Sequence, residues 1–315
     1  MSSYRRIKEV KIQFENVNTS SNTGPNHFGR KLKKYLKFFG HHCSEAQIPS
    51  PDAYLAFIQR VNFANRYEYA KNIQRLDGIY FDSSTNYMFL NKNIIDTYNS
   101  SDGVIVQSEF SKKLIEKYFG PHPKSVVINN GADYEYIDRI QPLKNPVLEE
   151  FSEVWSCASH WRGWKRLSEN IRYFLEFSPE DACLIVAGNV SPEEQIEDPR
   201  IFYVGELKTE MLFMLFKASK KFIHLARYDS CPNVVIDARA CGCQIVCCEN
   251  GGTKEIAGKD AIILREEMWD MEPLIVNDPP GLDFSLGTVE NEYDIDINMT
   301  KIAQKYANFI EDIVK

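Results

Sequence analysis

Residues 228–242 read YDSCPNVVIDARACG, and a short apolar run stands on either side of them, at 221–225 and 244–248. The two runs have the length and composition of buried strands, whereas 232–241 has the spacing of a helix. A strand, a helix and a strand in this order predict two parallel strands joined by a crossover helix. Asp229 and Asp237 stand eight positions apart, the first just before the expected helix and the second about two turns later.

The same alternation of strands and helices extends along the rest of the chain. Further strands are expected at 7–14, 76–81, 103–107, 125–128, 154–158, 183–187 and 201–204, and further helices at 28–39, 52–73, 91–99, 110–118, 166–177, 208–219 and 300–314. The pattern weakens at 138–151, so we place a linker there. The sequence therefore predicts an α/β protein with two Rossmann-like domains, residues 1–145 and 146–298, and a C-terminal helix at 299–315.

The sequence does not favour a dinucleotide-binding protein, because neither half contains G-x-G-x-x-G after its first strand. It does not favour a P-loop protein either, because G-x4-G-K-[ST] is absent. The chain has 37 Lys and Arg residues against 44 Asp and Glu residues, and its net charge of −7 disfavours nucleic acid as a partner. No apolar run approaches the roughly 18 to 20 residues that span a bilayer. Residues 1–6 lead into a strand-like segment, not a signal peptide, so we expect a cytoplasmic protein.

The chain contains eight cysteines, and none of them forms the C-x2-C pairs typical of zinc sites. A chain of this length has no need of disulfides, so we interpret them as reduced thiols of the core. A soft-metal site built from Cys241, Cys243, Cys247 and Cys248 is the alternative. Against it, these residues share their segment with apolar Ile245 and Val246, as in a buried strand.

The stretch 228–242, with Gly251, Gly252 and Glu255 after the following strand, resembles the E-x7-E signature of retaining glycosyltransferases of the family-4 (glycosyl transferases group 1) type. In this chain both acids are aspartates, and the Phe-Gly that follows the first acid in the family is missing. The resemblance implies the GT-B fold, in which two Rossmann-like domains form a cleft for donor and acceptor between them.

The resemblance also implies roles for the residues around the expected helix. Asp229 would accept hydrogen bonds from the donor sugar, and Asp237 would accept the two hydroxyls of a nucleotide ribose. The backbone N–H groups near Asn233 and Val234, at the positive end of the helix dipole, would meet the diphosphate. The alternative is an acidic helix cap at Asp229 and a solvated acid at Asp237.

A second basic stretch follows the first strand of the second half, where residues 160–166 read HWRGWKR. By resemblance, an arginine and a lysine at this place neutralise the departing diphosphate, which gains negative charge in the transition state. Lys165 matches the family lysine. His160 stands at the arginine position, and Arg162 is the candidate replacement. The alternative is a basic surface turn that tryptophans attach to the core.

The first half resembles the acceptor domain of the same family in three segments, 74–79, 104–112 and 127–133. Asp77, at an expected strand end, is the candidate that orients the acceptor hydroxyl or takes its proton. The alternative is a turn aspartate beside Gly78. We expect Asn130, Gly131 and Asp133 to shape the turn between the domains.

Gly24 lies in the loop before the first helix, where backbone N–H groups could meet the donor and domain closure could exclude water. On that helix, the residues from Arg30 to Lys37 alternate basic and apolar side chains. This pattern fits a peripheral membrane contact or an acidic acceptor. The alternative is a solvated face of a packed helix, for which α/β domains routinely use lysines. By resemblance, the C-terminal helix packs back on the first domain.

The sequence thus predicts a glycosyltransferase that moves a sugar from a nucleotide diphosphate, with UDP- and GDP-sugars favoured, to a hydroxyl of a glycan, glycoconjugate or lipid-linked acceptor. By resemblance it retains the anomeric configuration and needs no metal or cofactor. Asp294-Ile295-Asp296 has the D-x-D form of a metal motif but lies in an acidic segment away from any expected strand end. The alternatives are a sugar-nucleotide-binding or scaffold protein without catalysis, and a membrane-docked partner protein.

Overall fold

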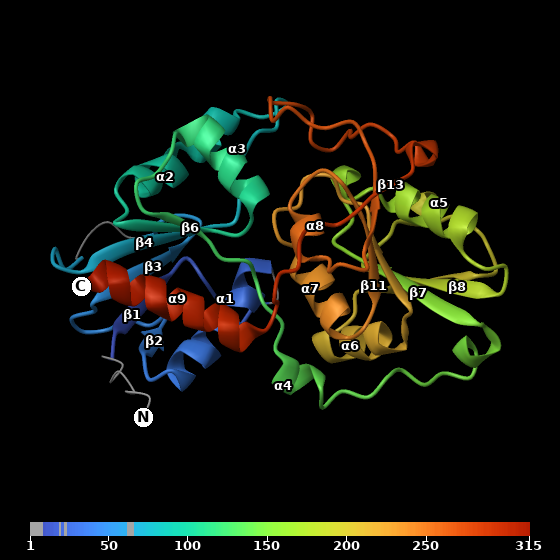
Figure 1. Ribbon diagram of the computed structural model, residues 1–315, viewed down its shortest axis with the longest axis horizontal. Helices are drawn as coiled ribbons and strands as arrows, with labels where there is room; N and C mark the ends of the chain where they lie inside the picture. Colours follow the sequence, from blue (N-terminus) through green and yellow to red (C-terminus); the bar gives the residue numbers. More distant parts are fainter. Residues whose placement is uncertain (1–8, 19, 22–23, 62–65) are drawn as a thin grey trace. The chain divides into compact units, whose positions relative to one another are not determined.

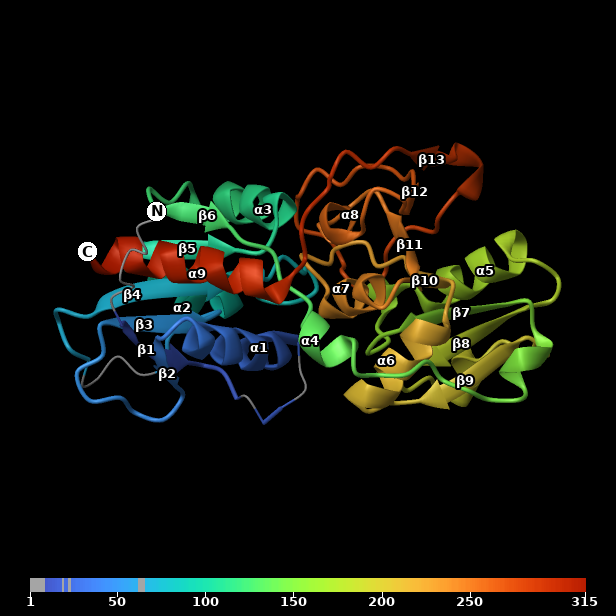
Figure 2. The same cartoon turned by 60° about the horizontal axis from the view of Figure 1, so that its bottom comes forward.

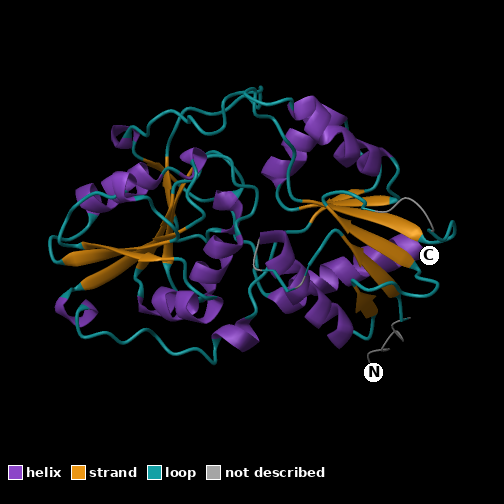
Figure 3. Cartoon of the chain, turned by 180° about the vertical axis from the view of Figure 1, so that it is seen from behind, coloured by secondary structure: helices purple, strands orange, loops and turns teal. Residues whose placement is uncertain are grey.

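The computed structural model describes residues 9–18, 20–21, 24–61 and 66–315. The chain divides into two compact units, and each unit is an α/β layer structure with helices on both sides of a mostly parallel sheet (Figure 3). The predicted fold class is therefore confirmed. Residues 7 and 8 of the first expected strand lie outside the described residues.

Unit 1 contains residues 1–81, 85–131 and 298–315. Its sheet has the order β2-β1-β3-β4-β5-β6, and every neighbouring pair of strands is parallel (Figure 2). The strands are β1 (Lys11–Glu15), β2 (His42–Ser44), β3 (Ala53–Phe57), β4 (Lys71–Leu76), β5 (Gly103–Val106) and β6 (Ser125–Val127). The helices are α1 (Gly24–Phe38), α2 (Tyr87–Asn99), α3 (Glu109–Phe119) and α9 (Met299–Val314).

The C-terminal helix α9 is part of unit 1 and lies beside α1 (Figure 1). Both helices carry an apolar stripe at helical spacing, and the two stripes are buried together in one core with the inner face of the sheet. Phe28 of α1 and Tyr306 of α9 form a tilted aromatic pair with ring centroids 5.7 Å apart. At the start of α3, the hydroxyl of Ser108 accepts a hydrogen bond from the N–H of Ser111 at 3.0 Å, as expected of a helix cap.

Two expected elements of unit 1 are wrong. Residues 52–73 do not form a helix, because Ala53–Phe57 is strand β3 and Lys71 begins β4; residues 62–65 lie outside the described residues. A strand buried on both faces has an unbroken apolar run, which periodicity cannot distinguish from a buried helix. The strand expected at 76–81 begins and ends earlier, since β4 carries buried polar residues that conceal its strand pattern.

Unit 2 contains residues 82–84 and 132–297, and its sheet has the order β13-β12-β11-β10-β7-β8-β9. All pairs are parallel except β12 with β13. The strands are β7 (Glu153–Ala158), β8 (Ala182–Ala187), β9 (Ile201–Gly205), β10 (Lys221–His224), β11 (Gln244–Cys248), β12 (Ile262–Leu264) and β13 (Thr288–Val289). The α-helices are α4 (Tyr134–Ile137), α5 (Leu167–Phe177), α6 (Thr209–Ala218), α7 (Asn233–Ala240) and α8 (Thr253–Ile256). Short 3-10 helices are η1 (Leu148–Glu150), η2 (Gly163–Lys165), η3 (Pro192–Glu194) and η4 (Phe284–Leu286).

The sheet of unit 2 separates two apolar cores, one under α6 and α7 and one under α5. Successive residues of a strand point to opposite faces, so Cys247 belongs to the first core and Cys248 to the second. All eight cysteines are unbridged, and burial raises the pKa of Cys247 to about 12. Within the described residues no three His, Cys, Asp or Glu side chains are grouped as metal ligands. The thiols of β11 are core side chains.

The chain passes from unit 1 to unit 2 between Gly131 and Ala132, earlier than the boundary that we expected after residue 145. The reason is packing: Ala132, Ile137 and Ile140 are buried in the core of unit 2 under α6 and α7. The weak sequence pattern at 138–151 thus lies inside unit 2. None of the described helices is long and apolar enough to cross a membrane.

Candidate functional site

Three charged or titratable side chains meet in unit 2 at the carboxyl end of its sheet. Lys165 Nζ lies 2.5 Å from Asp229 Oδ2, and His224 Nε2 lies 2.6 Å from the same oxygen. His224 is the last residue of β10, whereas Lys165 follows β7. The chain order reverses between these two neighbouring strands, and in open parallel sheets ligands bind beyond the carboxyl ends of strands at such a reversal.

The backbone on both sides of Lys165 is tightly held. Arg166 has a left-handed backbone, with φ at 53°, and its buried guanidinium bonds Glu266 at 2.9 Å and the carbonyl of Pro280 at 2.8 Å. A Cβ on Gly163 would overlap the backbone carbonyl of Asn277, so only glycine fits there. These contacts fix the backbone conformation of the turn that carries Lys165. The ammonium of Lys165 lies 3.9 Å from the centre of the Trp164 ring.

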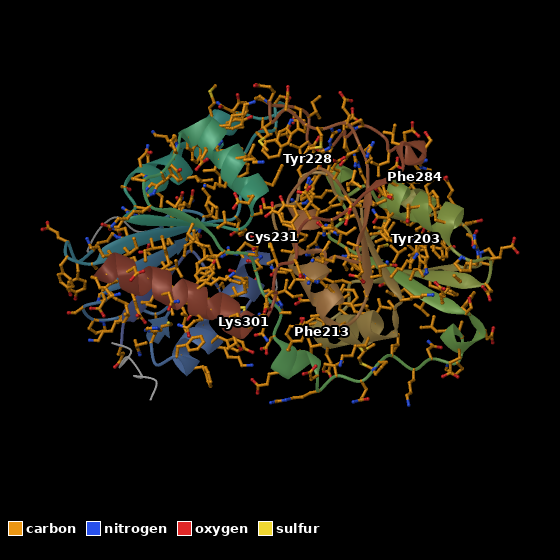
Figure 4. All side chains as sticks on the ribbon, in the orientation of Figure 1. Tyr203, Phe213, Tyr228, Cys231, Phe284 and Lys301 are labelled. Carbon is orange, nitrogen blue, oxygen red and sulfur yellow. The ribbon has the colours of Figure 1, made fainter. Side chains whose placement is uncertain are left out.

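The loop that carries Asp229 is fixed by the Gly-Gly turn after β11. The N–H of Gly252 donates to the carbonyl of Asp229 at 2.8 Å. Gly251 has φ at 82°, and a Cβ there would lie 2.9 Å from the carbonyl of Arg227. The glycines of the sequence signature thus allow two loops to approach each other closely. Figure 4 labels Tyr228 and Cys231, the buried side chains on either side of this acidic residue.

Burial and mutual charge set the protonation of the three side chains. Burial alone would raise the pKa of Asp229, but the Lys165 charge and the His224 hydrogen bond outweigh it and hold that pKa well below the usual range. Burial lowers the pKa of Lys165, against the opposing effect of Asp229. Burial likewise lowers the pKa of His224. Near neutral pH the cluster therefore contains one carboxylate, one ammonium and a neutral imidazole.

The helix that follows the loop, α7, begins at Asn233 and is eight residues long. Asn233 and Val234 occupy its first turn and are partly exposed, as a site for backbone N–H contacts requires. Asp237 lies one turn further along the helix and is 6% exposed. It is therefore a buried acid, not the solvated acid that the alternative interpretation expects.

The two candidates for the second cation are both exposed. His160 and Arg162 lie in the segment between β7 and η2. Arg162 is close enough to Lys165 for its charge to lower the lysine pKa. The exposed guanidinium of Arg162 can therefore add positive charge next to an anion that binds at Lys165.

Asp77 and Gly24 belong to unit 1. Asp77 follows β4, forms an ion pair with Arg75 and accepts a hydrogen bond from Gln107; burial, opposed by these contacts, raises its pKa. Arg75 is fully buried, and its guanidinium also donates to Asn130 at 2.7 Å and to the Tyr306 hydroxyl at 3.2 Å. The aspartate is therefore part of a network at the strand ends of unit 1.

Gly24 is the exposed first residue of α1. The apolar side of this helix is buried in the core of unit 1, and Lys31 is buried as well. Arg30, Lys34, Lys37 and Phe38 remain exposed, Phe38 to 76%. Most apolar residues of the basic amphipathic pattern are thus buried in the core of unit 1 and are not on the surface of the helix.

Comparisons with known proteins give a family model for part of unit 2 and solved structures of the same fold. Residues 155–272 match the model of the family described as glycosyl transferases group 1. The O-antigen chain mannosyltransferase B of Escherichia coli is 22% identical over 192 residues, which cover 56% of this chain and 50% of the relative. The chain thus aligns with about half the length of this curated relative.

Two solved glycosyltransferase structures share the fold over almost the whole chain. HepE of Anabaena in complex with UDP superposes with a TM-score of 0.64 at 13% identity, covering 96% of this chain and 100% of that chain. AviGT4, a glycosyltransferase involved in avilamycin A biosynthesis, superposes with a TM-score of 0.63 at 12% identity, covering 97% and 98%. The chain therefore shares the fold of these glycosyltransferases, and residues 155–272 match the group 1 family model.

Sequence reasoning missed several residues of the Asp229 cluster and of the Arg75 network. His224 contacts Asp229 but ends an apolar strand, where one histidine is no signal by itself. We expected Asn130, Gly131 and Asp133 to shape the turn between the domains, and the chain does pass from unit 1 to unit 2 after Gly131. The sequence did not show that Asn130 is also buried and hydrogen-bonded to both Arg75 and Gln107. Polar residues at the ends of three consecutive strands were the signal that could have revealed this network.

Proposed function

We propose that this chain transfers a sugar from a nucleoside diphosphate sugar to an acceptor hydroxyl, with retention of configuration and without a metal. The ion pair of Lys165 with Asp229 beside the start of α7 is the observation that carries the proposal. A leaving diphosphate gains negative charge, and a fixed ammonium in a partly buried site stabilises that charge more strongly than water does. Lys165 has three N–H donors, so it can contact a phosphate and keep Asp229 oriented.

The other donor contacts follow from the same elements. Asp229, kept ionised by Lys165 and His224, accepts hydroxyls of the transferred sugar. The N–H groups of Asn233 and Val234 bind the diphosphate at the positive end of the α7 dipole, and Arg162 supplies a second cation. Asp237 accepts the ribose hydroxyls. Retention is supported by the resemblance of the 228–242 signature to retaining enzymes.

In unit 1, Asp77 is the proposed group that orients the acceptor hydroxyl or accepts its proton. Its raised pKa, caused by burial, makes the carboxylate a better proton acceptor than an exposed aspartate. The ion pair with Arg75 and the hydrogen bond to Gln107 fix its direction. Gly24 is proposed to contact the donor through its backbone N–H.

The nature of the donor is supported by the names of the similar proteins. One HepE structure holds UDP-glucose, and the Escherichia coli relative is named a mannosyltransferase. We therefore propose a UDP- or GDP-sugar as donor and a glycan, glycoconjugate or lipid-linked hydroxyl as acceptor.

The test is a thermal-shift panel with UDP, GDP, ADP and CMP and their common sugar conjugates, with and without EDTA, followed by transfer assays with the sugar that shifts Tm. A ligand selective for the folded state raises stability with the logarithm of its saturation. We expect one nucleotide to shift Tm with EDTA present. NMR of the product anomeric proton reports retention.

Variants connect this activity to the site. We expect Lys165→Ala to lower kcat by on the order of 10² to 10³, the usual loss when one group that stabilises transition-state charge is removed. Lys220→Ala removes a lysine that pairs with Glu153 on the surface and serves as the control. Asp237→Ala should raise the KM for the donor. Donor binding without transfer to any acceptor would contradict catalysis, and equal activity of the two lysine variants would contradict the assigned site.

A further inference from the structure

Asn170 is a buried polar residue in the apolar stripe of α5. Leu167, Ile171 and Phe174 of this stripe belong to the core under α5. Asn170 occupies the same stripe at helical spacing and is 1% exposed. A packed helix face favours apolar residues, and a buried amide costs free energy unless its hydrogen bonds are made. Packing of α5 alone therefore gives no reason for an asparagine at this position.

The amide of Asn170 joins the two chain segments that carry Lys165 and His224. Its N–H groups donate to the carbonyl of Lys165 at 3.1 Å and to that of Arg166 at 2.6 Å. Its carbonyl accepts from the N–H of Leu225, the residue after His224, at 3.3 Å. One side chain thus connects the turn after β7 with the end of β10, the neighbouring strand at which the chain order reverses.

A buried carboxylate links the turn after β7 to the loop of Asp229. Glu266 bonds the guanidinium of Arg166 at 2.9 Å, and Arg227 Nε lies 3.8 Å from the same oxygen. The backbone N–H of Arg227 also donates to the carbonyl of Trp164 at 3.2 Å. Asp229 follows two residues later. The segments around the ion pair are therefore joined by several buried contacts, and the contacts of α5 reach the backbone of the lysine itself.

The place of the Lys165 ammonium depends on these links, because the next residue, Arg166, has a left-handed backbone. A non-glycine residue keeps this conformation only where its neighbours stabilise it, and Asn170 bonds its carbonyl. Lys165 Nζ and His224 Nε2 lie 2.5 Å and 2.6 Å from the same oxygen of Asp229. A shift of the turn relative to the end of β10 therefore changes the contacts of the whole cluster.

We propose that Asn170 is a positioning residue of the donor site. Its amide fixes the turn of Lys165 relative to the end of β10, and thereby the distance of the ammonium from Asp229. Asn170 itself does not touch the donor. The proposal rests on the proposed function, because it concerns the placement of the charge that meets the leaving diphosphate. A displacement of about 1 Å in such a group lowers the rate by on the order of 10².

The test compares Asn170→Ala with Asn291→Ala in the full chain. Asn291 is the matched control, because it is also a buried asparagine of unit 2, at 7% exposure. Its amide donates to the carbonyls of Lys254 and Gly258, and its carbonyl accepts from the N–H of Tyr293. None of these three residues is a neighbour in the chain of a cluster residue. Both variants lose three hydrogen bonds of a buried amide, so both should lower Tm by a similar amount.

NMR titration of the His224 imidazole reports on the cluster without any donor. Burial lowers the pKa of His224, the Asp229 carboxylate raises it, and the Lys165 charge lowers it again. A loosened turn moves the ammonium away, so we expect the titration midpoint to rise by about one pH unit in Asn170→Ala. In Asn291→Ala it should stay unchanged. In transfer assays we expect kcat of Asn170→Ala to fall by on the order of ten- to a hundredfold, with a smaller change of the donor KM.

The outcomes separate this proposal from the proposed function. A raised midpoint and a lower kcat in Asn170→Ala, both absent from Asn291→Ala, support it. An unchanged midpoint, an equal rise in both variants, or a raised midpoint with native kcat overturns it even if the native protein transfers sugar. A raised midpoint confined to Asn170→Ala, in a protein that transfers no sugar, leaves Asn170 as the residue that positions the cluster and refutes the transferase.

A second variant covers the case in which Asn170→Ala does not fold. Asn170→Ser leaves room for a water molecule to reach the three backbone groups, and its midpoint and kcat are then read in the same way. Failure of both variants to fold, where Asn291→Ala folds, assigns Asn170 to the stability of the core and overturns the proposal.

Discussion

Replacing Lys165 by methionine separates the charge of the ammonium from the bulk of the side chain. Asp229 then keeps His224 as its neighbour, 2.6 Å away, but loses its ion pair. The two paired side chains are 14% and 13% exposed, so the remaining carboxylate is largely desolvated. Breaking a buried ion pair from one side costs about 3–5 kcal/mol.

The loss should depend on pH, because His224 can replace the missing charge. In the native protein burial lowers the pKa of His224 and the imidazole is neutral. Without Lys165, the nearby carboxylate favours the imidazolium, and we expect the folded-state pKa to rise above the unfolded value of about 6.5. A raised folded-state pKa adds stability that is present below about pH 6.5 and is lost as the pH rises through the folded-state value.

Urea unfolding at about pH 6 and pH 8 measures this difference. We expect the Lys165→Met variant to lose about 3–5 kcal/mol at the higher pH and clearly less at the lower pH. Lys220→Met, which removes an exposed partner of Glu153, should lose at most about 1 kcal/mol at either pH. An equal loss for Lys165→Met at both pH values, with no upward shift of the His224 NMR titration, would refute the coupling of the three side chains.

Three further predictions concern the Arg75 network and the Asp229 cluster. Tyr306→Phe removes the hydroxyl that accepts from buried Arg75 at 3.2 Å, and chemical denaturation should show a loss of about 1.5–3 kcal/mol. Gly163→Ala forces a methyl group onto the carbonyl of Asn277, so we expect a lower Tm and, because Lys165 follows two residues later, a raised donor KM. Since burial lowers the pKa of His224, the unfolded chain binds its proton first and native stability should fall as the pH drops below about 6.5; His224→Gln should flatten this fall in an unfolding series.

The sequence predicted most of the fold because local patterns determine most of its elements. The strand at 244–248 and the helices ending at 99 and 177 agree with β11, α2 and α5. The failures at 52–81 have two causes: β3 is buried on both faces, and β4 carries buried Gln74 and Arg75. From the sequence alone, a polar side chain is expected to face solvent. Only the tertiary structure shows that it is buried with hydrogen-bond partners.

The candidate site was predictable in part. Asp229, Asp237 and Lys165 follow from a signature whose spacing is local to one helix and one turn. The role of His224 was not predictable, because it depends on contact with Asp229. The loop after β10 brings that carboxylate to the imidazole. The contacts of Asn170 were equally hidden, since Leu225 lies 55 positions away in the chain.

By itself the sequence determined the alternation of strands and helices and the parallel sheets that follow from it. It also determined the positions of the acids before and within α7 and of the glycines after β11. Each of these features depends on periodicity or on residues close in the chain. Tertiary structure alone decided which of these residues meet. Lys165 reaches Asp229, 64 positions away, because β10 pairs with β7 and not with the strand before it in the chain. Arg75 reaches Tyr306, 231 positions away, because the terminal helix packs in unit 1. Strand order and helix docking depend on the total apolar area that whole faces of sheets and helices bury. Many side chains far apart in the chain contribute to this area, so no local sequence pattern predicts it.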